Sequence, residues 1–224
     1  MPKIQPKYKF AVIAADIVIF TVKDGKLQVL LIKMKKKPFL DMWAAPGGLV
    51  RPLESVDNAA RRILKEKTGV TDVFLEQLYT FGRVDRDPFG RVVSVAYYAL
   101  IPNAGLKLKT SAEYGGVEWH PVDKLPELAY DHQEIIGCAV KRLRVKLEYT
   151  NVVYSLLPEE FTLGDMQKTY EIILDRELDK RNFRKKILAL KILKATEKKT
   201  IGEANRPAAL YRFLSHRPEN IEIL

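Results

Sequence analysis

The fold of the C-terminal part of the chain is decided by residues 178–190, Leu-Asp-Lys-Arg-Asn-Phe-Arg-Lys-Lys-Ile-Leu-Ala-Leu. This stretch predicts a short helix with one apolar face and one strongly basic face. A second helical segment precedes it, with Thr162 as its N-cap and Asp165 in the capping-box position. Two helices joined by a tight link indicate a helix-turn-helix, whose second helix enters the major groove of DNA.

An apolar stripe and a cap orient this basic helix. Phe183, Ile187 and Leu190 recur at i, i+4 and i+7, so we expect them to bury against the preceding helix. Asp179 is expected to cap the first turn. The cations that should then remain exposed are Lys180, Arg181, Arg184 and Lys185.

The residues after the basic helix predict the rest of a winged helix-turn-helix. Residues 193–200 and 208–214 are predicted strands, and the region 198–207 between them is the expected wing. Charge density peaks nearby, because residues 180–199 hold nine Lys or Arg and one acid, Glu197. Such a peak favours a polyanionic partner, although a solvated helix face has the same composition.

The position of each cation indicates its role on DNA. Arg181 and Asn182 lie near the start of the basic helix, where Arg pairs with guanine and Asn with adenine. Lys185 and Lys186 are expected to hold phosphates, and Arg206 on the wing to enter a minor groove. The expected DNA contacts are Lys180, Arg181, Asn182, Arg184, Lys185, Lys186 and Arg206.

The composition indicates a globular protein of two domains. The chain has 224 residues, of which 47% are hydrophobic, and a formal net charge of +10. It has no apolar run of about 18 residues to predict a membrane span, and its first residues lack the apolar core of a secretory signal. Its single cysteine, Cys138, excludes an internal disulfide and a Cys-rich zinc site. We therefore expect a cytoplasmic protein without a membrane partner.

The N-terminal part predicts an α+β domain over residues 1–147, followed by a second domain over residues 148–224. Asp24-Gly25 is a predicted hairpin turn between the first two strands. The predicted strands are residues 10–20, 28–34, 73–81, 92–101 and 117–120, and the predicted helices start at Ser55 and span 131–147.

A strand–loop–helix segment at residues 48–70 carries the motif of this domain. It resembles the Nudix box, which runs Gly, five residues, Glu, seven residues, Arg-Glu-apolar-any-Glu-Glu, any, Gly, apolar. The matching positions are Gly48, Glu54, Arg62, Leu64, Glu66, Gly69 and Val70. The resemblance implies a Nudix-like mixed-sheet α/β/α sandwich, whose enzymes use the box glutamates to hold a divalent metal and activate water.

Two departures from the box change its expected chemistry. Ile63 and Lys67 stand where the family has glutamates, so that the charge available to Mg²⁺ is largely lost. We therefore expect no catalytic residue and no metal site, although Glu54 and Glu66 could hold a weak Mg²⁺ ion. Acids supplied from elsewhere, such as Glu113 or Glu118, are the alternative.

A charged loop offers candidate ligand contacts. The loop runs from Asp85 to Gly90, and it is bracketed by Arg83, Arg86 and Arg91, which could pair with ligand phosphates. The alternative is that these arginines only balance the adjacent Asp85 and Asp87. The expected ligand-binding residues are Glu54, Glu66, Arg83, Arg86 and Arg91. The pair Asp131-His132, just before a predicted helix, is interpreted as a helix cap.

The two halves together resemble the NrtR-like family of Nudix-related transcriptional regulators. The resemblance rests on the degenerate box at 62–69, the loop Asp85-Arg86-Asp87-Pro88, and the segment from Leu157 to Lys186. It implies a homodimeric repressor that binds double-stranded operator DNA. Many members repress genes of NAD metabolism and release DNA on binding ADP-ribose, and some relatives sense a sugar such as arabinose.

Two other functions are compatible with these residues. One is an active Nudix hydrolase of ADP-ribose or a related nucleoside diphosphate, carrying an appended DNA-binding domain. The other is an interaction module in which the winged domain only forms dimers.

Overall fold

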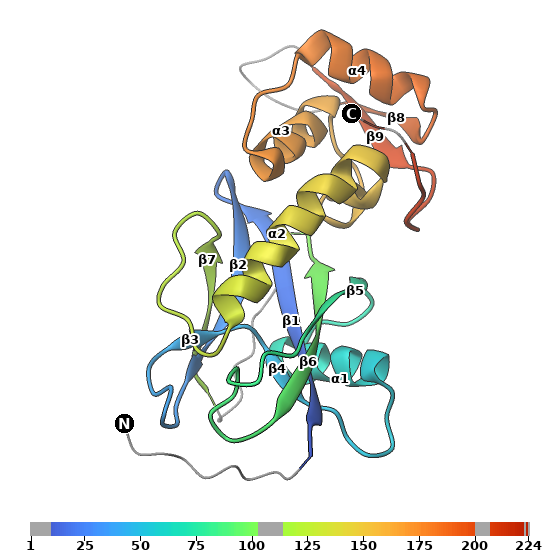
Figure 1. Cartoon of the computed structure of the whole chain (residues 1–224). Coiled ribbons are helices and arrows are strands. Elements are labelled where there is room, and N and C mark those ends of the chain that lie inside the picture. The colour runs from blue at the N-terminus through green and yellow to red at the C-terminus, as the bar shows by residue number, and fades with distance from the viewer. Residues whose placement is uncertain (1–9, 103–113, 200–206, 222, 224) are drawn as a thin grey trace. The chain divides into compact units, whose positions relative to one another are not determined.

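The computed structural model describes residues 10–102, 114–199, 207–221 and 223 (Figure 1). The chain divides into two compact units. The first unit contains residues 1–20, 28–100 and 106–140, and the second contains residues 21–27, 101–105 and 141–224. The division after Val140 lies inside helix α2 (His132–Tyr149), which also contains the boundary expected from the sequence at residue 147. No helix in the described residues is long and apolar enough to cross a membrane.

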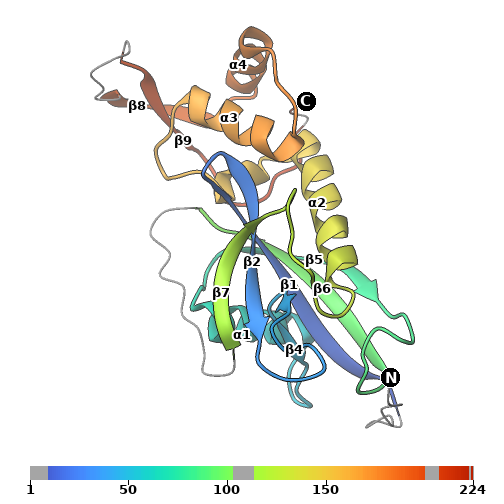
Figure 2. The same ribbon diagram turned by 90° about the vertical axis from the view of Figure 1, so that its left-hand side faces the viewer.

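A mixed sheet forms the centre of the first unit. Its described strands are β1 (Val12–Lys23), β2 (Lys26–Met34), β3 (Trp43–Ala44), β4 (Gly47–Leu49), β5 (Phe74–Phe81), β6 (Val92–Leu100) and β7 (Tyr114–Pro121). The order is β3-β2-β1-β6-β5, with β4 paired to β1 and β7 to β2. Strands β1 and β6 are parallel, whereas β5 and β6 are antiparallel. Helix α1 (Val56–Thr68) and the first turns of α2 lie on opposite faces of the sheet (Figures 1 and 2), which confirms the predicted sandwich.

Local sequence signals account for most of these elements. Asp24 and Gly25 both have positive φ, 52° and 71°, as a two-residue hairpin between twisted strands requires. The run Ile17-Val18-Ile19-Phe20 is fully buried, and the strand that contains it, β1, lies inside the sheet between β2 and β6. The hairpin and the apolar strands are therefore where the sequence predicts them.

Helix α1 is positioned by its caps and its apolar stripe. The Ser55 hydroxyl accepts a hydrogen bond from the Asn58 amide, and Gly69 ends the helix in the left-handed conformation at φ 75°. Ala59, Ala60 and Ile63 are fully buried against the sheet. These residues form an apolar stripe on one face of the helix, so Ile63 belongs to the hydrophobic core.

The second unit contains a helix-turn-helix followed by two antiparallel strands. Its further elements are η1 (Val152–Ser155), α3 (Leu163–Leu174), α4 (Lys180–Ala189), β8 (Leu193–Lys199) and β9 (Ala209–Phe213). Thr162 and Asp165 form the predicted capping box, and the Asp179 carboxylate accepts from the Asn182 amide at 2.7 Å. The expected wing residue Arg206 lies outside the described residues.

The turn between α3 and α4 is held by side chains of α3. The Gln167 amide donates to the Leu178 carbonyl at 2.9 Å, and the Glu171 carboxylate accepts from the Leu178 amide at 3.0 Å. Asp175 ends α3 as its C-cap residue and adopts the left-handed conformation, with φ 56°. These contacts fix the direction in which α4 starts.

The interface of the two helices confirms part of the predicted packing. Phe183 and Ile187 are buried, and the Phe183 ring lies 5.3 Å from that of Tyr170. Leu190 is only half-buried, because the helix ends there. The exposure expected for Arg184 is wrong. Its guanidinium lies beside Gly164 at the start of α3, and its Nε is buried without a hydrogen-bond partner among the described residues.

Two buried tyrosines form a matched pair for a stability measurement. The Tyr98 hydroxyl donates to the Glu76 carboxylate at 3.0 Å, whereas the equally buried Tyr170 hydroxyl has no partner within the described residues. We expect Tyr98→Phe to lower the free energy of unfolding by about 1 kcal/mol, and Tyr170→Phe to leave it unchanged or raise it by up to about 1 kcal/mol. Urea unfolding of both variants checks this; an equal loss in both would contradict it.

Candidate functional site

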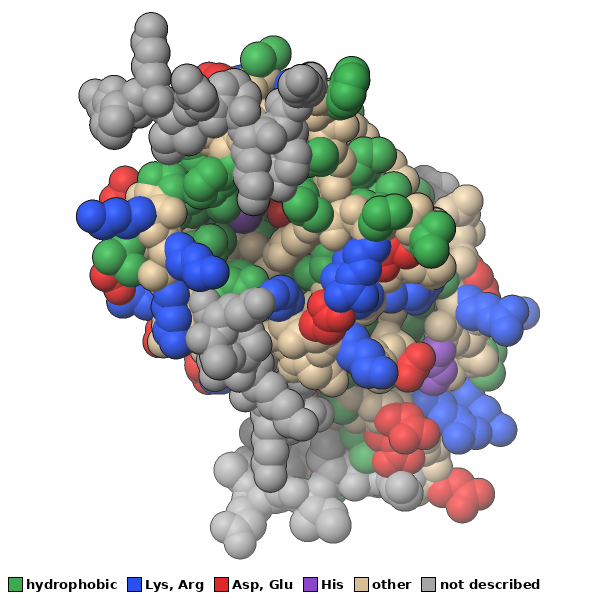
Figure 3. Space-filling model, turned by 90° about the horizontal axis from the view of Figure 1, so that it is seen from below, with side chains coloured by type: hydrophobic (Ala, Val, Ile, Leu, Met, Phe, Trp, Pro, Cys, Tyr) green, Lys and Arg blue, Asp and Glu red, His purple; other side chains and the backbone are tan. Residues whose placement is uncertain are grey.

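A cavity of about 410 Å³ opens between the sheet, the box and the loop before β6 in the first unit. Seen from the end at which β1 begins, the surface is hollowed and apolar side chains gather around the hollow (Figure 3). The residues lining the cavity are Ala14, Asp16, Ile32, Met34, Ala44, Ala45, Gly47, Gly48, Leu49, Arg86, Asp87, Phe89, Val92, Tyr114, Tyr130 and His132. Its walls are mainly apolar with a few polar groups, as in most small-molecule sites.

A glycine brings the box against β1 at this cavity. Strands β1 and β4 pair with Asp16 opposite Gly47. A Cβ atom on Gly47 would lie 2.0 Å from Asp16 Oδ1, so that only glycine permits this approach. The box loop therefore closes directly over the Asp16 side chain.

A buried ion-pair cluster lies beside this contact. Arg86 donates from Nε and Nη2 to the Asp131 carboxylate, at 2.9 and 2.7 Å, and from Nη2 to Asp16 Oδ2 at 3.1 Å. Its side chain is 3% exposed, and those of Asp131 and Asp16 are 2% and 8% exposed. The Ser94 hydroxyl also donates to Asp16, at 2.6 Å. A charge buried to this extent requires such partners.

His132 completes the polar wall. Its Nδ1 accepts from the Ala45 amide at 2.9 Å, so that the neutral ring carries its proton on Nε2. Burial lowers the pKa of His132, which keeps the ring neutral at pH 7. Asp131 lies at the start of α2, where its carbonyl accepts from the Ile135 amide at 3.2 Å. The interpretation of Asp131-His132 as a cap only is wrong for the side chains, since the Asp131 carboxylate is bonded to Arg86 and His132 lines the cavity.

The acids that remain in the Nudix box are both paired with Arg62. Its Nε donates to Glu54 at 2.9 Å and its Nη1 to Glu66 at 3.1 Å. The hydrogen bond from Arg62 lowers the pKa of Glu54 to about 2. Ile63 is buried, and its Cδ1 lies 3.5 Å from the point where a Cβ on Gly48 would be. The Lys67 ammonium lies 4.6 Å from the centre of the Tyr114 ring.

These residues do not fit the divalent-metal centre that the Nudix fold implies. Within the described residues, no three His, Cys, Asp or Glu side chains are grouped to hold a metal ion. The two box acids are paired with Arg62, and Lys67 adds a positive charge close by. Of the alternative acids, Glu118 is 64% exposed and does not line the cavity, while Glu113 lies outside the described residues.

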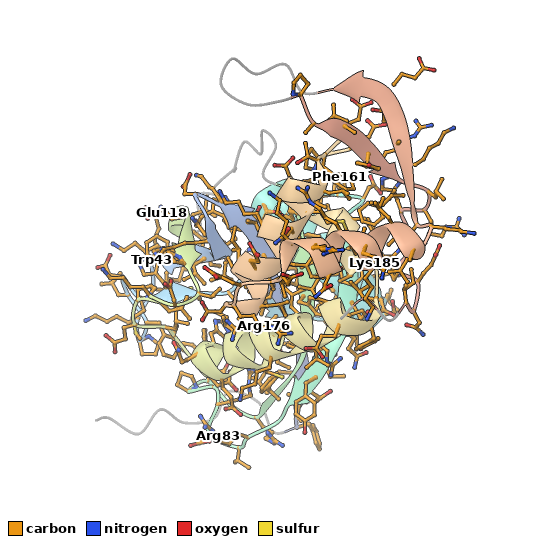
Figure 4. The ribbon with its side chains drawn as sticks, turned by 90° about the horizontal axis from the view of Figure 1, so that it is seen from above. Trp43, Arg83, Glu118, Phe161, Arg176 and Lys185 are labelled. Carbon is orange, nitrogen blue, oxygen red and sulfur yellow. The ribbon has the colours of Figure 1, made fainter. Side chains whose placement is uncertain are left out.

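The predicted ligand residues lie in three different settings. Arg86 lines the cavity, but its charge is already paired. Arg83 points outward from its loop (Figure 4) and pairs with Asp85 at 2.8 Å. Arg91 donates to the Gly82 carbonyl at 2.8 Å. Arg83, Arg91, Glu54 and Glu66 do not line the cavity, and a ligand role for them stays a prediction.

The sequence interpretation missed the polar wall of the cavity. Asp16, Ser94 and Tyr130 were not considered, and His132 was assigned to a cap. One signal was present, because Asp16 is a charged residue inside the otherwise apolar run Val12–Phe20, where a charge needs a buried partner. Its partners lie on distant segments, and no local pattern identifies them.

The basic face of α4 is largely exposed in the second unit. Lys180, Arg181, Asn182, Lys185 and Lys186 are exposed, and Figure 4 shows Lys185 on this helix. Among the expected DNA contacts, Arg184 is half-buried and Arg206 is not described. The exposed set lies on the helix that a winged helix-turn-helix inserts into DNA.

The comparisons with known proteins cover both units. The family described as NUDIX domain matches residues 12–139, and the NrtR DNA-binding winged helix domain matches residues 153–213. The ADPR responsive transcriptional repressor NtrR of Acinetobacter baylyi is 38% identical over 212 residues, 92% of this chain and 83% of that protein. The ADP-ribose pyrophosphatase of Methanocaldococcus jannaschii is 36% identical over 129 residues, 58% of this chain and 73% of the enzyme.

The crystal structures of Shewanella oneidensis NrtR are similar in fold. The structure in complex with a 27mer DNA has a TM-score of 0.79 and 34% identity, covering 90% of this chain and 93% of that one. Its NUDIX domain in complex with ADP ribose has a TM-score of 0.54 and 37% identity, covering 61% of this chain and 90% of that one. The chain therefore belongs to the NrtR family of Nudix-related transcriptional regulators, in which a Nudix domain is joined to a DNA-binding winged helix domain.

Proposed function

We propose that this protein is a repressor that binds operator DNA through α4 and releases it when ADP-ribose binds the first unit. The observation that carries the proposal is the combination of an exposed basic α4 with a cavity-containing Nudix unit whose box acids are held by Arg62. Relatives that match most of the chain are a repressor responsive to ADPR and an NrtR bound to DNA.

An electrophoretic shift assay with and without ADP-ribose tests this proposal directly. We expect the full chain to shift DNA from upstream of its own operon, and micromolar to millimolar ADP-ribose to abolish the shift. Arabinose and other free sugars are the alternative effectors and are titrated in parallel. DNA binding that no ligand changes would contradict an effector role for the first unit.

We further propose that the repressor is a homodimer on an operator with two half-sites. One helix-turn-helix buries too little surface for tight specific binding, and two-fold dimers match half-sites about one helical turn apart. A footprint over two such half-sites is expected from the same DNA.

Replacement of single cations separates base readers from phosphate contacts. Arg181 lies in the first turn of α4, where side chains reach base edges, so Arg181→Ala should cost roughly 1–3 kcal/mol on the operator and little on scrambled DNA. Lys186 lies in the last turn. Lys186→Ala should weaken both DNAs similarly and lower the salt slope by about one unit. The affinities of both variants for operator and scrambled DNA, measured at several salt concentrations, test these assignments. If Arg181→Ala binds the operator as tightly as the wild type, α4 does not dock in the major groove as proposed.

We propose that the Nudix unit has no hydrolase activity and binds Mg²⁺ weakly at most. The support is the pairing of Glu54 and Glu66 with Arg62 and the presence of Ile63 and Lys67 at acid positions. Purified protein with ADP-ribose and Mg²⁺ should form no AMP above a blank, with the Methanocaldococcus jannaschii pyrophosphatase as positive control. Turnover that Glu66→Ala abolishes would show an active hydrolase instead.

A further inference from the structure

Three polar atoms on the wall of the cavity have no hydrogen-bond partner in the described part of the chain. They are Asp16 Oδ1, Arg86 Nη1 and His132 Nε2, each on a side chain that is more than nine-tenths buried. Asp16 Oδ1 and His132 Nε2 lie 3.7 Å apart, too far for a good hydrogen bond between them. The wall therefore offers one acceptor beside two donors.

The charge of this wall disfavours a phosphate. Arg86 is held between the carboxylates of Asp16 and Asp131, which leaves the cluster with a net negative charge. Asp87 adds a further carboxylate to the lining, and within the described residues no Lys or Arg other than Arg86 lines the cavity. A phosphate group placed against this cluster would be repelled. A neutral ligand group is not.

A neutral group with adjacent hydroxyls satisfies these atoms. Each hydroxyl both donates and accepts, so two neighbouring hydroxyls can donate to Asp16 Oδ1 and accept from Arg86 Nη1 and His132 Nε2. We propose that Asp16, Arg86 and His132 form a pentose subsite that binds the vicinal hydroxyls of a sugar, with the phosphates of a nucleotide effector outside it. Only the choice of nucleotide rests on the proposed function.

The wall is held in place before any ligand binds. Ser94 and Asp131 fix Asp16 and Arg86, and the Ala45 amide orients His132. Tyr130, next to Asp131 in the chain, has a left-handed backbone at φ 57°, which is costly for a bulky residue and typical of ligand sites. A site in which polar groups are already positioned loses little entropy when a sugar binds.

Two variants each change one of the proposed sugar contacts by a substitution of similar shape. Asp16→Asn keeps the shape but removes the charge that strengthens its hydrogen bonds. His132→Asn keeps an acceptor for the Ala45 amide and removes the Nε2 donor. Glu127→Gln changes an exposed acid that does not line the cavity, and serves as control. Thermal unfolding of all three verifies the fold, and if one variant is unfolded the other carries the measurement.

Calorimetric titration of the full chain with ADP-ribose and with ADP measures the dissociation constant of each variant for the two ligands. We expect Asp16→Asn and His132→Asn to weaken ADP-ribose binding by about 10- to 100-fold and the control not at all. If the terminal ribose occupies the subsite, ADP binding is unchanged in both variants. If the adenosine ribose does, ADP binding falls too, and the loss disappears with 2′-deoxy-ADP. Unchanged or tighter binding of ADP-ribose by Asp16→Asn would overturn the proposal, because removal of a carboxylate facing a phosphate raises affinity.

The subsite and the proposed function can fail separately. If wild-type protein does not bind ADP-ribose, the proposed effector is wrong, and the subsite is then measured with D-ribose and 2-deoxy-D-ribose by saturation-transfer NMR. We expect D-ribose to bind more tightly, and His132→Asn to remove the difference. Equal binding of the two sugars, or no binding of either, would overturn the pentose subsite.

Discussion

The buried charge of Arg86 is the constraint on which the first unit depends. Its guanidinium can remain inside the protein only because Asp16 of β1 and Asp131, next to α2, both accept its hydrogen bonds. The three residues come from segments far apart in the chain, so the ion pairs fix the strand, the loop before β6 and the start of α2 together. Removing one partner from such a cluster typically costs about 3–5 kcal/mol. The cavity is built on this cluster, and Gly47 allows the box loop to close over it.

The box of this chain keeps the fold of the Nudix helix without the full set of acids that the family's pattern contains. Helix α1 keeps the Nudix stripe and caps, and so keeps its place on the sheet. Ile63 contributes to the core instead of the surface, and Arg62 ties Glu54 and Glu66 to each other. Positions that supply metal ligands in the family's enzymes here supply packing and internal ion pairs. A cavity of about 410 Å³ lies beside them, large enough for a small-molecule effector.

In the second unit, a turn fixed by hydrogen bonds positions a helix with exposed basic side chains. Gln167 and Glu171 hold the turn before α4, and Phe183 and Ile187 anchor the helix. The exposed lysines and arginines of α4 therefore project from a fixed frame, as sequence-specific contacts to DNA require. Arg184 departs from this pattern, because its guanidinium lies beside Gly164 at the start of α3.

The sequence by itself determined the elements whose signals are local. The Asp24-Gly25 turn, the stripe of α1, the capping box of α3 and the Asp179 cap follow from residues a few positions apart, and all are present. The polar wall of the cavity was decided only by tertiary structure. Its bonds join residues 45 to 87 positions apart, and neither periodicity nor a short motif reports on such pairs. For the same reason the sequence showed three arginines around one loop, whereas only the fold determined that Arg86 turns inward to two buried carboxylates and Arg83 outward to Asp85.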